Sequence, residues 1–450
     1  MIYRKFYFEN YKGIKEKVEI DIDANSEKPY CIIGNNEGGK TTILKGINLI
    51  GKLCVSGGKI KEQDLIKIKP KIDFFSENIC LGTILQFNNK DFPNEKQLTF
   101  LDGDNHLEVI FTFKFSKNKF DETEIEIKLN SNKIANELHK HIFSLIKEKA
   151  QEIVYYDDFM FEIPEFIRYK KNKKKIEDKK FLSDLNNSWQ DIFDDILKAT
   201  YNRDDISFQE SVVDWNEKEQ GITSIIPQME AYLTKILDDW KSNEGSNISG
   251  FKIDRHDTED FADFSIQLLS KNNKRFAINE RSKGLQWSFC FNVLTEIKKH
   301  RRPNGFIFLL DEPANNLHMH IQRKMLKQEL NTICSNKNIV IYSTHASCLI
   351  DRNNIENIFI VKNKASEFED TNIILSSCKN EKLDECITTI DTEPLLISSI
   401  ENDILNIDVD DKKEPVWHKI TDWFKEKVDV EKLTTIGSNL ANIIDKLPKN

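Results

Sequence analysis

The segment GNNEGGKTT, residues 34 to 42, constrains the fold of this chain more than any other part of the sequence. It fits the pattern GxxxxGK followed by Ser or Thr. A short apolar run over residues 30 to 33 precedes it, and apolar residues at helical spacing follow it over residues 41 to 53. A strand, a glycine-rich loop and a helix in this order form a P-loop, in which backbone amides at the helix N-terminus point at phosphate oxygens. The flanking strand and helix argue against the alternative, a chance match in a turn.

The P-loop predicts ATP and Mg²⁺ as ligands of this chain. Lys40 is expected to meet the β- and γ-phosphates, and the hydroxyl of Thr41 is expected to ligate Mg²⁺. The loop residues expected to bind the nucleotide are Gly34, Asn35, Asn36, Glu37, Gly38, Gly39, Lys40, Thr41 and Thr42.

The stretch FIFLLDEP, residues 306 to 313, is an apolar strand that ends in two carboxylates. An acidic pair in such a place is often only a helix N-cap. In a chain with a P-loop it indicates catalysis. Asp311 is then expected to hold Mg²⁺ through water, and Glu312 to polarise the attacking water as general base.

A further apolar strand, in IVIYSTHAS, carries Ser343, Thr344 and His345 to the carboxyl edge of the sheet. Ligands bind at this edge in open α/β sheets. A histidine after a strand is more often a structural group with its hydrogen bonds satisfied. Because His345 follows the P-loop and the acidic pair, we expect it to sense the γ-phosphate as part of the catalytic site.

Hydrophobic periodicity predicts an α/β fold with a mixed or parallel sheet flanked by helices, an antiparallel β lobe and an inserted helical subdomain. The expected strands span residues 2–9, 18–22, 30–33, 84–87, 107–115, 124–129, 306–310 and 339–342. The expected helices of the insertion span residues 134–152, 188–200 and 225–240. Four segments follow: residues 1–131 with the P-loop, the insertion over 132–248 for dimerisation or partner binding, the second half over 249–374, and an acidic helical tail over 375–450 that would dock a partner.

The turn in ERSKGLQWSF, residues 280 to 289, opens an apolar helix and is by itself a weak signal, because a serine there is commonly a cap. The P-loop, this turn, DEP and STH nevertheless occur in the order of the ABC ATPases. In those proteins a Ser-Gly turn contacts the γ-phosphate bound to the opposite subunit. Ser282 and Gly284 match that turn, whereas Lys283 stands where the common pattern has a glycine.

The opening FENYKGIKEKVEIDI, and DEPANNLHMHIQ followed by STHASCLI, resemble the OLD and RecF family of ATPases over residues 1–130 and 250–365. The resemblance implies an ABC-type ATPase head of the SMC/RecF/OLD kind. It also implies a head-to-tail homodimer or higher oligomer, with ATP between the P-loop of one subunit and the Ser-Gly turn of the other. NNLH, residues 315–318, resembles the D-loop, and Gln63 is the candidate for the Q-loop glutamine. The insertion lacks sustained heptads, so the long coiled-coil arm of an SMC protein is not expected.

OLD-family members usually continue into a Toprim nuclease, which needs a glutamate after one strand and a DxD after another. Residues 394–405 and 408–411 echo these elements but lie too close together for the βαβ crossover between them. We therefore expect no nuclease activity in this chain.

Free-standing ATPases of this kind resemble the ATPase subunits of bacterial anti-phage systems such as Septu and PARIS. This resemblance implies a sensor or scaffold that controls a separate effector, usually a nuclease. A RecF-like DNA-repair ATPase that clamps DNA in an ATP-dependent manner is the alternative. An ABC transporter cassette is disfavoured, because a well-formed LSGGQ is absent.

The net charge of −9 argues against a wholly basic nucleic-acid coat. The basic run RYKKNKKKIEDKK, residues 168–180, could still bind nucleic-acid phosphates, although such runs are usually solvated surface. The 8 cysteines are scattered without a CxxC pair, which predicts buried free thiols rather than a zinc site. No window approaches the roughly 18 apolar residues of a membrane span, so we expect a cytoplasmic protein that does not bind membranes.

Overall fold

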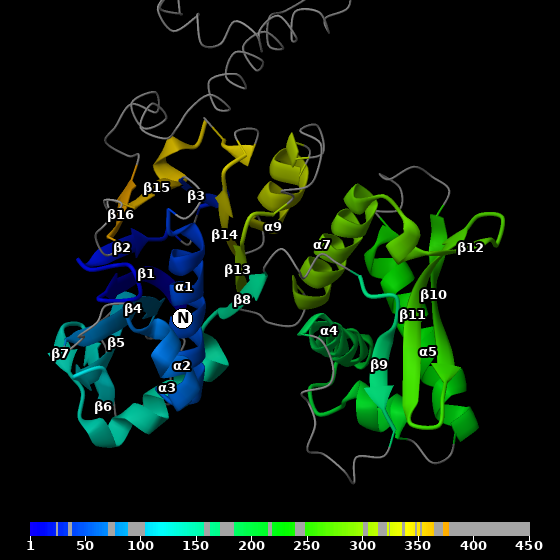
Figure 1. Ribbon diagram of the computed structural model, residues 1–450, viewed down its shortest axis with the longest axis horizontal. Coiled ribbons are helices and arrows are strands. Elements are labelled where there is room, and N and C mark those ends of the chain that lie inside the picture. Colours follow the sequence, from blue (N-terminus) through cyan, green and yellow to red (C-terminus); the bar gives the residue numbers. More distant parts are fainter. Residues whose placement is uncertain are drawn as a thin grey trace, which may run out of the picture.

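The computed structural model describes three sheets and the helices that cover them. Its described residues are 1–23, 26–34, 38–70, 77–88, 104–156, 163–171, 184–214, 218–238, 248–299, 305–313, 322–323, 325–334, 338–346, 349–351, 353–363 and 372–377. Figure 1 shows the first two sheets with α1 on one side of the molecule and the third sheet with α4, α5 and α7 on the other.

The first sheet is antiparallel, with the strand order β2-β1-β4-β5-β6-β7. Its strands are β1 (Ile2–Glu9), β2 (Val18–Asp21), β4 (Asn78–Asn88), β5 (Asp104–Ser116), β6 (Lys119–Leu129) and β7 (Asn132–Lys133). Buried residues alternate with half-buried or exposed ones along β5, because one face of the sheet packs on the core and the other is more open to solvent. The predicted antiparallel lobe is confirmed.

The second sheet has the order β16-β15-β3-β14-β13-β8, and all of its neighbouring strands are parallel except β15 and β16. The strands are β3 (Tyr30–Ile33), β8 (Glu152–Tyr156), β13 (Phe306–Leu310), β14 (Ile339–Thr344), β15 (Ile358–Asn363) and β16 (Ile373–Ser377). Every residue of β3, β13 and β14 is buried, as expected for interior strands that are covered on both faces. Together the two sheets confirm the predicted α/β fold with an antiparallel lobe.

Helix α1 (Lys40–Ser56) lies between the first and second sheets. Its buried residues include Ile43, Leu44, Ile47 and Ile50, which recur every three or four positions and so form one continuous apolar face. They share one core with residues of both sheets. The P-loop helix is therefore packed against both of these sheets.

The third sheet joins β10 (Ile248–Asp257), β11 (Phe261–Ser270), β12 (Arg275–Ala277) and β9 (Ile167–Lys170). It packs with α4 (Asp184–Tyr201), α5 (Lys218–Ile236) and α7 (Lys283–Lys299). The remaining short helices and turns are α2 (Glu62–Ile68), α3 (His139–Lys149), α9 (Asn331–Cys334), η2 (Asn136–Leu138), η6 (Gln209–Val213), η7 (Ile278–Glu280), η8 (Met325–Leu330) and η10 (Ile355–Asn357).

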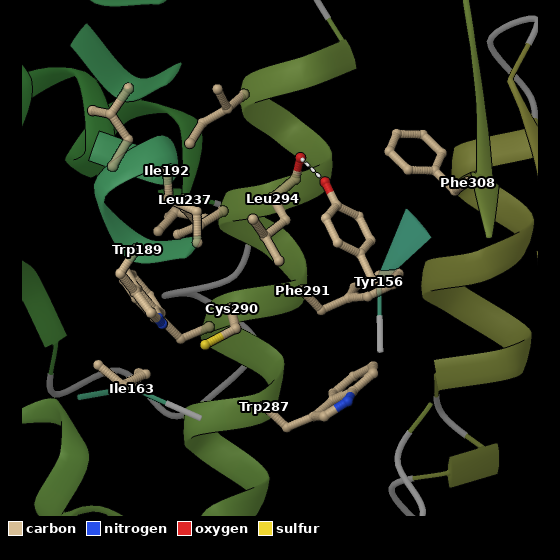
Figure 2. Packing of buried hydrophobic residues seen from close by; sticks show 14 of the residues in the cluster. Tyr156, Ile163, Trp189, Ile192, Leu237, Trp287, Cys290, Phe291, Leu294 and Phe308 are labelled. Atoms are coloured by element: carbon tan, nitrogen blue, oxygen red, sulfur yellow. Dashed lines mark hydrogen bonds between the residues drawn. The ribbon is translucent and has the colours of Figure 1, made fainter. Parts of the chain in front are cut away.

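Helix α7 connects the two sides of the molecule through one buried core, shown in Figure 2. Trp189 and Ile192 of α4 lie on one side of α7. On the other side, the hydroxyl of Tyr156 donates to the carbonyl oxygen of Leu294 at 3.5 Å, and the Tyr156 ring stacks on Phe308 with centroids 6.3 Å apart. The helix that begins at the Ser-Gly turn thus contacts Tyr156 of β8, which in turn stacks on Phe308 of β13.

The segment over residues 132–248 contains helices at the expected places, and it also contains strands β7, β8 and β9, which the sequence analysis did not predict. Within the helix expected over 134–152, only α3 is α-helical, and β8 follows it into the P-loop sheet. Strand β9 pairs with β11. Short strands such as EIVYY carry no two-residue alternation, and their partners lie far away in sequence. Local periodicity therefore could not detect them.

No helix in the described part of the chain is long and apolar enough to cross a membrane. In the 249–374 segment, β10, β11 and β12 belong to the third sheet and do not join the P-loop sheet. Strands of that sheet reappear in the chain at β13. The segment boundaries themselves remain predictions.

Candidate active site

The P-loop runs from Gly34, at the end of β3, to the N-terminus of α1. Gly39 is the N-cap of α1, and neither a side-chain cap nor an acidic first-turn residue occupies this end. The first backbone N–H groups of a helix have no partner within the helix and carry partial positive charge. This end of α1 is therefore suited to an anion. Asn35, Asn36 and Glu37 lie outside the described residues.

Two glycines of the loop are required by close contacts with β15 and β16. A Cβ on Gly34 would lie 2.4 Å from the carbonyl oxygen of Val361, and one on Gly39 would lie 2.6 Å from Cδ1 of Ile373. Gly39 also has φ 107°, a conformation that a side chain would strain. The loop is seated on the hairpin that these two strands form. Gly38 is buried and Thr42 is partly buried.

Asp311 is buried, with 7% of the residue exposed, and its carboxylate lies beside the first turn of α1. Its Oδ1 accepts hydrogen bonds from Thr41 Oγ1 at 3.1 Å and from Ser343 Oγ at 2.7 Å. Thr41 and Asp311, which are 270 positions apart in sequence, thus come together. A hydroxyl and a carboxylate are hard oxygen ligands of the kind that Mg²⁺ prefers, so this pair fits the expected metal.

The side chain of Glu312 lies between the ammonium group of Lys40 and the imidazole of His345. Lys40 Nζ is 3.0 Å from Glu312 Oε1, and His345 Nδ1 is 2.8 Å from Oε2. Lys40 is 6% exposed and also donates to the carbonyl oxygen of Gly34 at 3.0 Å. Glu312 has φ 48°, a left-handed conformation that is uncommon for a non-glycine residue, and its N–H donates to Ser343 Oγ at 2.9 Å. Such local strain clusters at functional sites.

The AAA ATPase domain family matches residues 1–350 of the chain. The chain belongs to the AAA ATPase domain family. The matched segment contains all the residues that the sequence analysis assigns to the nucleotide site.

Two curated proteins match shorter segments of this family member. A glycine betaine/carnitine/choline transport ATP-binding protein, OpuCA of Bacillus subtilis, is 36% identical over 77 residues, which are 16% of this chain and 20% of that protein. The uncharacterized protein MJECL43 of Methanocaldococcus jannaschii is 28% identical over 109 residues, or 22% of this chain and 27% of that protein. The chain therefore spans only 20% and 27% of the length of these relatives.

Among solved structures, the chain is similar to an Smc head bound to the C-winged helix domain of ScpA, with a TM-score of 0.46, 14% identity, and coverage of 86% of this chain and 100% of that chain. A second is the Smc head domain with an extended coiled coil bound to the C-terminal domain of ScpA, derived from Pyrococcus furiosus. Its TM-score is 0.44 with 13% identity, covering 89% of this chain and 99% of that chain.

The Ser-Gly turn of this AAA ATPase domain lies at the N-terminus of α7, with Ser282 exposed and Gly284 partly buried. Ser282 Oγ accepts from the N–H of Leu285 at 3.4 Å, which is the contact of a weak helix cap. Gln286 braces the turn, because its side-chain nitrogen donates to the carbonyl oxygen of Arg281 at 2.7 Å. Among the described residues, the Ser282 hydroxyl bonds within its own turn and makes no hydrogen bond to the P-loop of the same chain.

Tyr155 is a site residue that the sequence analysis missed. Its hydroxyl donates to Asp311 Oδ2 at 2.7 Å from the neighbouring strand β8. Nothing in the run EIVYY distinguishes this tyrosine from one in an apolar core. Only the pairing of β8 with β13 brings it to the carboxylate.

The basic run over residues 168–180 is described only as far as residue 171. Arg168 already forms two hydrogen bonds with Asp263, at 2.8 and 2.7 Å, and Lys171 Nζ lies 2.7 Å from Asp257 Oδ1. These two cations are therefore engaged within the chain. The rest of the run, the D-loop-like residues 315–318 and most of the tail lie outside the described residues, as does the side chain of Gln63.

The cysteines that the structure describes carry free thiols, as predicted. The buried ones are Cys31, Cys54, Cys290 and Cys334, and Cys80 is half-buried. Burial raises the pKa of the Cys31 thiol to about 12. Such thiols are neutral and poor nucleophiles.

Proposed function

We propose that this AAA ATPase domain binds Mg-ATP at the P-loop and hydrolyses it with Glu312 as the general base. The observation that carries the proposal is the position of the Glu312 carboxylate, 3.0 Å from Lys40 Nζ and 2.8 Å from His345 Nδ1. This places a base, a cation and an imidazole at the carboxyl edge of the sheet, beside the open end of α1.

Lys40, Thr41 and Asp311 would hold the phosphates and the metal. The Lys40 ammonium exchanges its contact with Glu312 for the β- and γ-phosphates, while the amides of the first turn of α1 donate to phosphate oxygens. Thr41 and Asp311 would hold Mg²⁺, which when bound neutralises charge on the phosphate oxygens.

Glu312 then accepts a proton from the attacking water. Its carboxylate is oriented by His345, whose backbone N–H also donates to Oε2 at 3.3 Å. Its backbone is anchored by Ser343, whose hydroxyl bonds both the Glu312 N–H and the Asp311 carboxylate. A shift of Ser343 or His345 on γ-phosphate binding would therefore reposition the base, which is the basis for assigning a sensing role to His345.

Hydrolysis of ATP by the purified chain, measured as phosphate release over a Mg²⁺ titration, tests this assignment. We expect Asp311→Asn to need a higher Mg²⁺ concentration for half-maximal hydrolysis, because it loses a metal-binding group. Lys40→Ala should remove ATP binding altogether. Wild-type Mg²⁺ dependence in the Asp311→Asn variant would remove Asp311 from the metal site.

We also propose a head-to-tail dimer in which Ser282 and Gly284 of one subunit meet the ATP of the other. The exposure of Ser282 at the start of α7 supports this arrangement. A mixture of Lys40→Ala and Ser282→Arg chains tests it, because each mixed dimer would keep one intact site. Each variant alone should be inactive, and random pairing should restore about a quarter of the wild-type activity. If the sites were built from one subunit alone, Ser282→Arg chains would be active by themselves, which would refute the arrangement.

On the resemblance given above, we propose that the ATPase is the sensor or scaffold of an anti-phage complex that controls a separate effector such as a nuclease. Docking would use the tail or the 132–248 insertion, and this chain would itself have no nuclease activity. Co-purification of the tagged chain from its native operon, with and without ATP, tests this role. A solitary protein that binds DNA only with ATP would favour the RecF-like alternative.

A further inference from the structure

Strand β8 ends in two adjacent tyrosines whose side chains lie on opposite faces of the sheet, as the two-residue period of a strand requires. Tyr155 points to the nucleotide site, where its hydroxyl donates to Asp311 Oδ2 at 2.7 Å. Tyr156 points to α7, where Figure 2 shows its hydroxyl directed at the carbonyl oxygen of Leu294. The two hydroxyls therefore leave the same strand end on opposite faces of the sheet, one toward Asp311 and the other toward α7.

The Asp311 carboxylate is held by three hydroxyl groups from three elements. Thr41 of α1 and Ser343 of β14 donate to Oδ1, and Tyr155 of β8 donates to Oδ2. Within the described residues, Tyr155 is the donor that reaches Oδ2. A carboxylate bonded only through Oδ1 could turn about its Cβ–Cγ bond, so the tyrosine fixes its plane.

The backbone restrains the same contact. Leu309 pairs with Tyr155 and Leu310 with Tyr156 in the parallel register, and the N–H of Asp311 donates to the carbonyl oxygen of Tyr156 at 2.9 Å. The strand that carries Tyr155, β8, is thus hydrogen-bonded to β13, the strand that leads into Asp311, up to its last residue. A hydrogen-bond donor on a strand fixes the position of its acceptor more precisely than a donor on a loop does.

We propose that Tyr155 is a positioning residue for the metal-binding carboxylate of this ATPase. By fixing Oδ2, its hydroxyl orients Asp311 so that Oδ1 and the Thr41 hydroxyl, which would hold the metal, keep one relative geometry. The inference rests on the proposed role of Asp311 at the Mg²⁺ site. Loss of an outer-shell partner of this kind typically weakens metal affinity by about 10- to 100-fold.

The test compares Tyr155→Phe with Tyr156→Phe, a matched control that removes one hydroxyl from the adjacent residue on the opposite face. Binding of Mn²⁺, used as the spectroscopic probe, is measured by electron paramagnetic resonance with a non-hydrolysable ATP analogue present. We expect Tyr155→Phe to weaken Mn²⁺ binding by at least about 10-fold, and Tyr156→Phe to leave it within about twofold of wild type.

Two further measurements separate positioning from damage to the fold. Nucleotide binding without metal should be unchanged in Tyr155→Phe, and saturating Mg²⁺ should restore its phosphate release, which a misfolded protein would not allow. Equal Mn²⁺ affinity in the two tyrosine variants would overturn the inference. Unchanged Mn²⁺ affinity in Asp311→Asn would instead overturn the proposed metal site, and the inference with it.

Discussion

Replacing Glu312 by glutamine separates its chemical role from its structural one. The amide keeps the size of the side chain and an oxygen that can accept from Lys40, at the position where Oε1 now lies 3.0 Å from the ammonium. It removes the negative charge and with it the ability to take a proton from water. Binding of ATP should therefore survive while hydrolysis stops.

The expected size of each effect follows from these contacts. Loss of a positioned general base lowers the rate by about 10²- to 10⁴-fold, or about 3–5 kcal/mol in the barrier. Glu312 is 17% exposed and bonds Lys40 and His345, and a charge-assisted hydrogen bond is about twice as strong as a neutral one. The folded protein without nucleotide should accordingly lose about 1–3 kcal/mol of stability.

The chain offers a matched control in Glu230, which is remote in the fold. It is 8% exposed and bonds Lys252 Nζ at 2.6 Å and the N–H of Ile253 at 2.9 Å, so it is also a buried glutamate paired with a lysine. Glu230→Gln should lose a similar amount of stability and keep the wild-type rate of hydrolysis. Single-turnover phosphate release, calorimetric ATP titration and denaturant unfolding would be measured on both variants.

The reasoning fails if Glu312→Gln releases phosphate within about tenfold of the wild-type rate, since a positioned base contributes more than that. It also fails if Glu230→Gln slows hydrolysis as much as Glu312→Gln does. In that case loss of stability, and not loss of the base, would explain both variants.

Three other changes have definite expected results. Lys40→Ala should abolish ATP binding in calorimetry, and unchanged affinity would remove the P-loop assignment. Gly34→Ala places a Cβ 2.4 Å from the backbone oxygen of Val361, so denaturant unfolding should show a loss of about 1–3 kcal/mol together with lost nucleotide binding. Burial raises the pKa values of Cys31 and Cys54 to about 12, so their thiolates form only as the pH rises toward that value. Alkylation at pH 8, mapped by mass spectrometry, should spare both residues in the folded protein and reach them in denaturant; rapid native labelling would contradict the buried positions.

Local sequence determined much of the first two sheets. The prediction matched β1, β3 and β13 in full, and it placed β2, β5 and β14 within a few residues, because each run has an unambiguous period or a continuous apolar stretch. The helix after the P-loop was equally clear. The two chemical motifs, GNNEGGKTT and DEP, stand at strand ends that periodicity could locate.

The tertiary structure alone decided which strands lie side by side. Nothing in the sequence indicated that β14 lies between β3 and β13, an order that lets Ser343 reach both Asp311 and the N–H of Glu312.

The same holds for β8, a strand of the P-loop sheet that lies within the segment expected to be helical. Its Tyr155 becomes a partner of Asp311 only through hydrogen bonds to a strand more than a hundred positions away. Side-chain periodicity reports which face of an element is buried, whereas strand order depends on contacts between distant segments that no local pattern records. The sequence by itself therefore determined the parts of the site, and the packing of the sheet decided which residues hold them in place.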